Sequence, residues 1–158
     1  MPDYRVRTGR LDDIPVLVRH RIDMFAALHV PIEHDAVVAA YGRWLETTLP
    51  SGVYRAWLVE TAAGEVVAGG GITVVPWPPG PRSLGDRAAF VYNIYTEPAH
   101  RRRGLARIVL ETIHAWCREN RVLAGALTAS PEGMPLYESM GYRLTTSPMM
   151  FCVLDEAG

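Results

Sequence analysis

The segment from residue 87 to residue 120 constrains the fold of this chain more than any other. Residues 87–96 are rich in β-forming side chains, so they predict a strand. A turn dense in Arg and Gly follows, and a helix is predicted from about residue 102 to residue 120, because apolar residues recur there at steps of three and four. The apolar face comprises Leu105, Ile108, Val109, Thr112, Ile113, Trp116 and Cys117. A strand that leads directly into an amphipathic helix is typical of a domain built around a central sheet.

The rest of the chain supplies further strands and helices. Asp12 and Asp13 favour the start of a helix that ends at Pro31, and a second helix is predicted from Asp35 to just before Pro50. Other expected strands cover residues 4–8, 54–60, 65–75, 123–128 and 149–154, and a short helix covers residues 132–140. The resulting order, β-α-α-β-β-β-α-β-α-β, predicts an α/β or α+β fold, and residues 1–158 have the length of a single domain.

Two segments in the middle of the chain depart from regular patterns. Three consecutive glycines, residues 69–71, lie inside an expected strand and predict a β-bulge or a close approach of two backbones. Residues 76–85 contain four prolines that remove backbone donors, so this segment is predicted to be an irregular loop.

The composition excludes several classes of protein. Sixteen basic and seventeen acidic residues give a net charge of −1, which disfavours a general nucleic-acid or anionic-membrane binder. The N-terminus lacks the apolar stretch of a signal peptide, and no apolar run approaches the ~20 residues that span a bilayer. Two cysteines, Cys117 and Cys152, are too few for a disulfide framework or a Cys-based zinc site, and no metal is expected. We therefore expect a cytoplasmic protein.

The turn at residues 101–106 is the strongest candidate for a binding site. A helix N-terminus presents unpaired backbone N–H groups at the positive end of the helix dipole, which suits a phosphate or pyrophosphate. Gly104 allows close approach of such a ligand, Ala106 is small, and Arg101 to Arg103 add mobile positive charge. Two alternatives remain open at this point: a solvated Arg cluster that only begins a helix, and a tribasic nucleic-acid patch.

Two sequence blocks resemble the signatures of the GCN5-related N-acetyltransferases. Residues 98–106, Pro-Ala-His-Arg-Arg-Arg-Gly-Leu-Ala, are similar to the Arg/Gln-x-x-Gly-x-Gly/Ala signature of that family. Residues 129–142 resemble its second signature, in which a Leu-Tyr-Glu helix leads to Gly-Phe or Gly-Tyr. Arg102 stands where Gly is common, and Ala106 stands where Gly is more frequent. The resemblance implies the family's mixed central β-sheet flanked by helices.

The resemblance also implies how a coenzyme binds. Acetyl-CoA, or a related acyl-CoA, would occupy a cleft between parallel strands that end near Thr96 and Thr128. The pyrophosphate would lie on backbone amides at the start of the long helix, and the pantetheine arm would pair with the preceding strand. The implied cofactor-binding residues are Ile94, Tyr95, Thr96, Arg101, Arg102, Arg103, Gly104, Leu105, Ala106, Arg107 and Ser130.

Two residues are expected to carry the chemistry. Tyr137 matches the family position that often protonates the departing thiolate, and a phenol with a pKa near ~10 is a plausible acid toward a thiolate. The alternative is that Tyr137 only packs. Glu97 is the candidate base for the acceptor amine, directly or through water, although a solvated Glu at a strand end is the stronger alternative. Asn93 and Tyr95 share its strand face by alternation and are candidates to orient that water.

Other candidate residues have weaker support. His29, Glu33 and His34 lie between the first two helices, where the family shapes its acceptor site, but a surface role is favoured for them. His100 and His114 are expected in a loop and on a helix surface, and Cys117 is expected to be an inert core thiol.

The expected activity is therefore transfer of an acetyl group to a primary amine. The main alternative is a catalytically silent acyl-CoA-binding sensor, and the other is the nucleic-acid module that uses the Arg cluster. The acceptor is a small molecule or a peptide; peptide N-termini, antibiotics, polyamines and amino acids all stay open. No nucleic-acid or membrane partner is expected, and a homodimer is common in the family that the chain resembles.

Overall fold

The chain divides into two compact units, residues 1–128 and residues 129–158, and the computed structural model describes residues 3–154. The first unit is built on one five-stranded sheet in the order β1-β2-β3-β4-β5. The strands are β1 Arg5–Thr8, β2 Tyr54–Glu60, β3 Val66–Pro76, β4 Arg87–Thr96 and β5 Gly125–Ala126. The first four strands pair antiparallel, whereas β4 and β5 pair parallel. The sheet is therefore mixed, as the resemblance implied.

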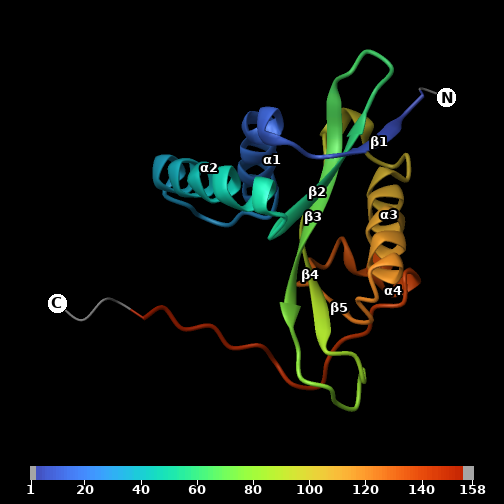
Figure 1. Cartoon of the computed structure of the whole chain (residues 1–158). Helices are drawn as coiled ribbons and strands as arrows, with labels where there is room; N and C mark the ends of the chain where they lie inside the picture. The colour runs from blue at the N-terminus through green and yellow to red at the C-terminus, as the bar shows by residue number, and fades with distance from the viewer. Residues whose placement is uncertain (1–2, 155–158) are drawn as a thin grey trace. The chain divides into compact units, whose positions relative to one another are not determined.

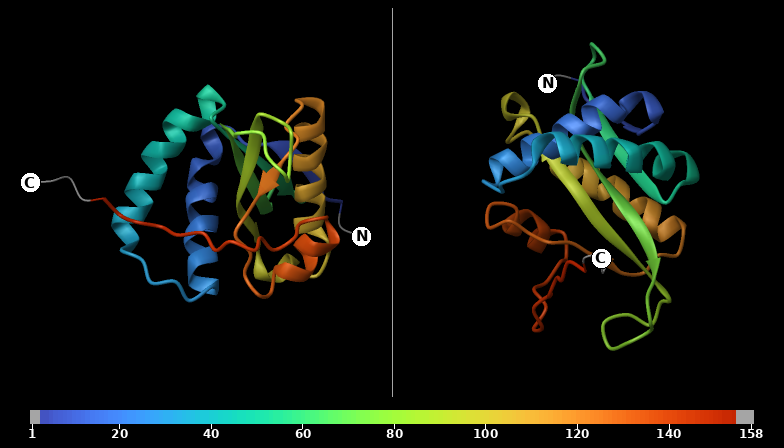
Figure 2. Two further views of the ribbon diagram at one scale, coloured as in Figure 1. Left: turned by 90° about the horizontal axis from the view of Figure 1, so that it is seen from below. Right: turned by 90° about the vertical axis from the view of Figure 1, so that its left-hand side faces the viewer.

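Helices cover both faces of this sheet. Helices α1 (Ile14–Ala27) and α2 (His34–Ser51) lie on one face, and α3 (Leu105–Glu119) lies on the other (Figure 1). The left view of Figure 2 shows this order of layers, with the sheet between α1 and α3. Short 3-10 turns, Leu11–Asp13 and Pro98–His100, precede α1 and follow β4.

The buried faces of the helices follow their apolar periodicity. On α3 the buried residues include Leu105, Val109 and Ile113, as predicted, and also Leu110, whereas Ile108 is 37% exposed. On the other face, the core cluster of α1, α2 and β2 contains Leu17, Tyr41, Leu45, Tyr54, Ala56 and Leu58.

The three glycines of β3 mark a bulge, as predicted. The register between β3 and β4 shifts between Gly69 and Gly71, where two residues of β4 oppose one of β3. Neighbouring side chains also pack directly against these glycines, since a Cβ on Gly70 would lie 2.3 Å from Ile94 Cδ1, and a Cβ on Gly71 would lie 2.3 Å from the Tyr54 hydroxyl. No side chain fits at either position without a shift.

The second unit contains α4 (Met134–Ser139), inside the predicted helix 132–140. The expected final strand at residues 149–154 is wrong, because none of these residues joins a β-ladder. A strand is stable only when its backbone groups are paired, and here apolar side chains such as Met150 and Phe151 are 91% and 88% exposed. The high β-propensity of the segment is therefore not sufficient to form a strand.

Two other predicted boundaries are also corrected. Helix α2 continues through Pro50, which lies in its last turn, and Gly52 ends the helix with φ 73°. The strand expected at residues 123–128 is reduced to Gly125–Ala126. Across residues 3–154 no helix is both long and apolar enough to cross a membrane.

A buried charge cluster joins β1, β2 and the turn before α1. Arg7 donates to both carboxylate oxygens of Asp13 at 2.7 Å and also to Glu60, which pairs with Arg5 at 2.8 Å. Asp13 and Glu60 are each only 6% exposed. Burial alone would raise the pKa of Asp13, but the hydrogen bonds from Arg7 and from the Arg10 backbone N–H, together with the charges of both arginines, outweigh it and hold that pKa below its usual value.

The variant Asp13→Asn should lower the free energy of unfolding by about 2 kcal/mol, because it leaves the Arg7 guanidinium with one carboxylate instead of two. Because the pKa of Asp13 is lower in the folded protein than in the unfolded chain, its ionised carboxylate contributes fully to folding stability above the ordinary pKa near ~4. This contribution is lost as the pH falls through the folded-state pKa. Urea unfolding between neutral and acidic pH checks both points. The exposed neighbour provides the control, Asp12→Asn; equal losses in the two variants would contradict the role of the cluster.

Candidate functional site

One edge of β4 is left unpaired by the sheet. Strand β5 pairs with β4 only at Ala89 and Phe90. Beyond Phe90, β4 pairs with β3 on one side except at residues 93 and 94, which form the bulge, and no described residue forms a ladder with residues 91–96 on the other side. The parallel strands β4 and β5 therefore have a short contact and then a free strand edge, which leads toward the N-terminus of α3 (Figure 1). An extended ligand could pair with this edge as an added strand.

The turn that follows β4 presents backbone amides. Gly104 is the N-cap of α3 with φ 77°, and Arg102 has φ 63°. The amides of residues 102–106 have no acceptor among the described residues, and a Cβ on Gly104 would meet no atom within 4 Å. Unpaired N–H groups at the start of a 15-residue helix suit an anion such as a diphosphate.

The three Arg side chains of this turn differ in how they are held. Arg101 donates to the Thr96 carbonyl at 3.0 Å, and its guanidinium lies 5.8 Å from the centroid of the Tyr95 ring. Arg103 donates to the Tyr4 hydroxyl at 3.3 Å and to the Ala99 carbonyl at 3.4 Å. Arg101 and Arg103 are thus anchored, which corrects the expectation that all three provide mobile charge.

Glu97 is fixed on the α1 side of β4. Its Oε1 accepts hydrogen bonds from Arg19 at 2.6 Å and from His20 Nε2 at 3.0 Å. Burial lowers the pKa of His20, although the hydrogen bond to Glu97 opposes this effect, so the imidazole is neutral near pH 7. Since an ionised carboxylate only accepts, Nε2 of His20 carries the proton. The other carboxylate oxygen, Oε2, has no partner in the described part of the chain.

Asn93 connects the bulge of β4 to both helices on that face. It has φ 59°, a conformation that is uncommon outside glycine. Its Nδ2 donates to the hydroxyls of Tyr41 (3.0 Å) and Tyr54 (2.9 Å), and its Oδ1 accepts from Arg21 at 2.5 Å. Burial raises the pKa of both tyrosines, so they remain neutral.

The predicted sharing of one strand face is confirmed. Tyr95 packs against His20 with ring centroids 5.0 Å apart, and Asn93 and Glu97 also contact α1. The three side chains therefore face the same helix. Ile94, in contrast, lies near Val109 on the α3 side.

Tyr137 and Ser130 belong to the second unit. The Tyr137 ring makes an edge contact with Tyr142, with centroids 6.1 Å apart. Burial raises the pKa of the Tyr137 phenol, so that it keeps its proton beyond the ordinary range. Ser130 Oγ and carbonyl both accept from the Gly133 amide, at 3.2 and 3.1 Å, and this arrangement begins the turn before α4.

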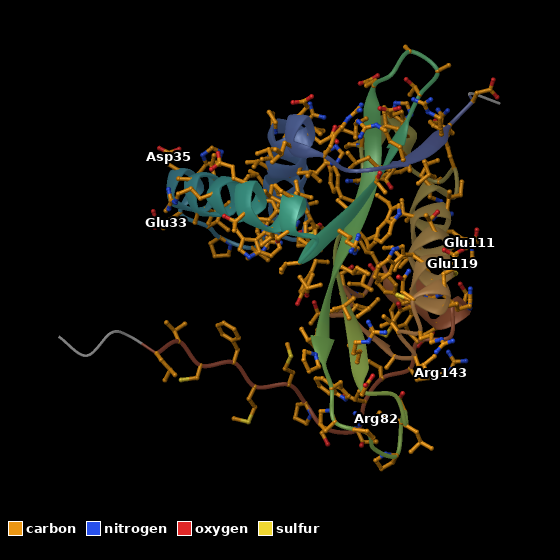
Figure 3. The ribbon with its side chains drawn as sticks, viewed as in Figure 1. Glu33, Asp35, Arg82, Glu111, Glu119 and Arg143 are labelled. Carbon is orange, nitrogen blue, oxygen red and sulfur yellow. The ribbon has the colours of Figure 1, made fainter. Side chains whose placement is uncertain are left out.

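The residues with weaker support lie mainly at the surface. His29, Glu33 and His34 are exposed, and Figure 3 shows Glu33 and Asp35 at the end of α2, pointing away from the sheet. His34 pairs with Asp35 at 2.9 Å. Within residues 3–154 no three His, Cys, Asp or Glu side chains are close enough together to hold a metal ion.

His100, His114 and Cys117 are partly or fully covered. His100 is bonded to the Tyr4 hydroxyl at 2.9 Å, and His114 is half-buried on α3. Cys117 is buried as predicted, and burial raises the pKa of its thiol, which makes it a poor nucleophile.

His20 and Arg21 were missed by the sequence reasoning, although they contact the candidate site. The available signal was the helical spacing from Leu17, which is buried. Residues three and four positions later, His20 and Arg21, lie on the same face of α1. A histidine and an arginine on an otherwise apolar face would have marked both as candidate site residues, although not their partners.

A family model and several solved structures match this chain. The model of the acetyltransferase (GNAT) family matches residues 21–142. No protein with a curated description matches the sequence significantly. A GCN5-related N-acetyltransferase from Ralstonia eutropha is 29% identical, with a TM-score of 0.83, over 95% of this chain and 99% of that one.

Two more distant structures share the fold. A predicted acetyltransferase with acetyl-CoA from Clostridium acetobutylicum is 23% identical with a TM-score of 0.85, over 95% of this chain and 96% of that one. Glucosamine-6-phosphate N-acetyltransferase from Arabidopsis thaliana is 18% identical with a TM-score of 0.70, over 97% of this chain and 99% of that one.

Proposed function

Because this chain belongs to the GNAT acetyltransferase family, whose model matches residues 21–142, we propose that it transfers the acetyl group of acetyl-CoA to a primary amine. One observation carries the proposal: the unpaired edge of β4 leads into a turn whose amides have no acceptor among the described residues. A coenzyme with an extended amide-containing arm and a diphosphate complements both features. The related Clostridium acetobutylicum protein, described with acetyl-CoA, supports the choice of donor.

In the proposed complex, the diphosphate accepts hydrogen bonds from the backbone amides between Arg101 and Ala106. The pantetheine arm pairs with Ile94, Tyr95 and Thr96 along the free edge of β4. Gly104 permits the approach, because its position is open and its φ of 77° disfavours other residues. Arg102 is exposed, and its side chain forms no hydrogen bond or ion pair with the other residues that the structure describes, so it can add a charge-assisted contact to a phosphate.

The proposed reaction is direct attack in a ternary complex. The neutral amine nitrogen forms a bond to the thioester carbonyl carbon, the carbon–sulfur bond breaks, and the thiolate of coenzyme A leaves with the bonding electron pair. A backbone N–H of β4 polarises the carbonyl oxygen. Tyr137 gives its proton to the thiolate, and Glu97 accepts the proton that the amine loses, through a water molecule bound at Oε2.

The proposal is tested with purified protein, acetyl-CoA and a panel of primary amines. Release of the free thiol, followed with a chromogenic reagent, is expected only when donor and acceptor are both present. Isothermal calorimetry measures coenzyme binding independently. Failure of coenzyme A to bind would overturn the proposed site.

The variant Glu97→Gln should lower the rate of acetyl transfer near pH 7 by about tenfold. This loss is smaller than the contribution of a direct proton transfer, because solvent water replaces part of the role of Glu97. The deficit should narrow as the pH rises toward the pKa of the amine, since more acceptor is then already neutral. Rates of thiol release between pH 6 and 9.5 give this profile. Glu111→Gln, an exposed change on α3 (Figure 3), is the control; a deficit that is independent of pH would remove Glu97 as the base.

A further inference from the structure

Arg21 is a half-buried cation without an acidic partner. Its guanidinium carbon lies 4.8 Å from the ring centroids of both Phe25 and Tyr41, and one of its N–H groups donates to Asn93. No carboxylate in the described part of the chain forms an ion pair with it. Its neighbour Arg19, in contrast, pairs with Glu97. The positive charge of Arg21 is therefore not neutralised by the protein residues that hold it.

The groups around Arg21 position it without removing its charge. Asn93 is uncharged, and burial keeps the phenols of Tyr41 and Tyr54 neutral. A guanidinium has five N–H donors, and only the one bonded to Asn93 has an acceptor among the described residues. A cation fixed by aromatic rings, with donors to spare, binds an anion at little cost in side-chain entropy.

The location of this cation relates it to the proposed reaction. Asn93 directly precedes Ile94–Thr96, the strand edge assigned to the pantetheine arm. Its positive φ turns the strand at the bulge, and its side chain reaches α1 and α2. Strained backbone of this kind costs about 1–3 kcal/mol and is retained where the surroundings require it. Arg21 is thus bonded to the residue that adjoins the thioester end of the proposed coenzyme site.

We propose that Arg21 binds an anionic group on the acceptor, so that the substrate is an amine that also carries a carboxylate or a phosphate. This inference rests on the proposed acetyl transfer, because it concerns the acceptor of that reaction. The cation orients the acceptor by its anionic end, while the amine nitrogen faces the thioester. Simple polyamines, which carry only positive charge, are disfavoured because they would be repelled by Arg21.

The test uses pairs of amines in which one member carries an anionic group and the other does not. One series compares α-amino acids with their amides, and the other compares ethanolamine phosphate with ethanolamine. In at least one series, kcat/KM for the member with the anionic group should exceed that for the member without it by about 20-fold, the value of one charge-assisted contact. The series with the larger ratio identifies the anion as carboxylate or phosphate.

The variant Arg21→Gln should reduce this ratio to within about twofold while coenzyme affinity, measured by calorimetry, stays unchanged. Arg21→Lys should keep part of the preference, because it keeps the charge. Arg43→Gln, an exposed change on α2, should leave the ratio as in the wild type. A ratio that survives in Arg21→Gln would overturn the anion site.

The wild-type protein alone also decides the question if Arg21→Gln does not fold. In the presence of coenzyme A, calorimetry should detect binding of the N-acetylated product of the preferred anionic amine. It should detect no binding of the N-acetylated product of the matching amine that lacks the anionic group. If the members without the anionic group react with an equal or higher kcat/KM, the inference is overturned and the acetyl transfer is left intact. Absence of coenzyme binding, together with no thiol release from any amine, would overturn the proposed function itself and the inference with it.

Discussion

Replacing Tyr137 with phenylalanine should lower kcat by about 10²–10³-fold and leave the dissociation constant of coenzyme A within about twofold. The change removes one oxygen and keeps the ring, including its edge contact with Tyr142. General acid catalysis is typically worth ~10²–10⁴-fold, and water near the thiolate supplies part of it in the variant. Single-turnover thiol release and calorimetry measure the two quantities separately.

The pH dependence distinguishes an acid from a packing residue. Burial raises the pKa of Tyr137, so in the wild type the phenol stays protonated through neutral and mildly alkaline pH. The wild-type rate should therefore fall only when the phenol ionises, above its ordinary pKa of ~10. The variant should lack this alkaline fall. A variant with wild-type kcat, or with the same alkaline limb, would exclude Tyr137 from proton transfer.

Tyr142→Phe is the matched control for this experiment. Tyr142 lies in the same short segment and touches the same ring, but the family signature gives it no role in proton transfer. We expect a kcat within about threefold of the wild type. An equal loss in both variants would point to disturbed packing of the second unit rather than to a missing proton donor.

The sequence was most informative where a local pattern leaves one structural solution. The step of three and four between Leu105, Val109 and Ile113 required one buried face of α3, and those residues are buried. The glycines at positions 69–71 predicted a bulge or a close backbone approach, and the register between β3 and β4 shifts there. These features depend on neighbours in sequence or on one adjacent strand, which a single chain reveals.

The contacts of the candidate site were less accessible, because they join residues far apart in sequence. The hydrogen bond from Arg21 to Asn93 spans 72 positions, and the contact of His20 with Glu97 spans 77. Periodicity places His20 on the inner face of α1, but it does not reveal that β4 presents a carboxylate there. The left-handed conformation of Asn93 is equally unreadable, since asparagine is common in ordinary strands and turns.

Segment 149–154 was predicted to be a strand and forms none. Its apolar, β-forming residues fit a strand by local pattern, yet strand formation is decided by a partner edge that local pattern does not contain. Pro50 is a milder case. Its missing N–H and its ring disturb only the hydrogen bond to the carbonyl four residues earlier, and the helix ends directly afterwards, at Ser51, so the cost of the proline is confined to the last turn.

Replacing Gly104 with valine should weaken coenzyme A binding by about 100-fold. At φ 77° a β-branched residue is strained, so the turn in the free variant relaxes toward another backbone conformation. Binding of coenzyme A then has to restore the strained conformation, which lowers the affinity. The strain of about 1–3 kcal/mol, together with a side chain in the space beside the amides, accounts for this loss. Calorimetric titration with coenzyme A measures it directly.

Gly64 provides a control, because it also has a positive φ but lies outside the proposed coenzyme site. It lies in the loop between β2 and β3, has φ 82°, and a Cβ there would also meet no atom within 4 Å. Gly64→Val should therefore lower the melting temperature to a similar degree as Gly104→Val and leave coenzyme affinity unchanged. If both variants lose a similar amount of stability and only Gly104→Val loses affinity for coenzyme A, the diphosphate lies at the N-terminus of α3. Full affinity in Gly104→Val would mean that the amides of residues 102–106 do not hold the diphosphate.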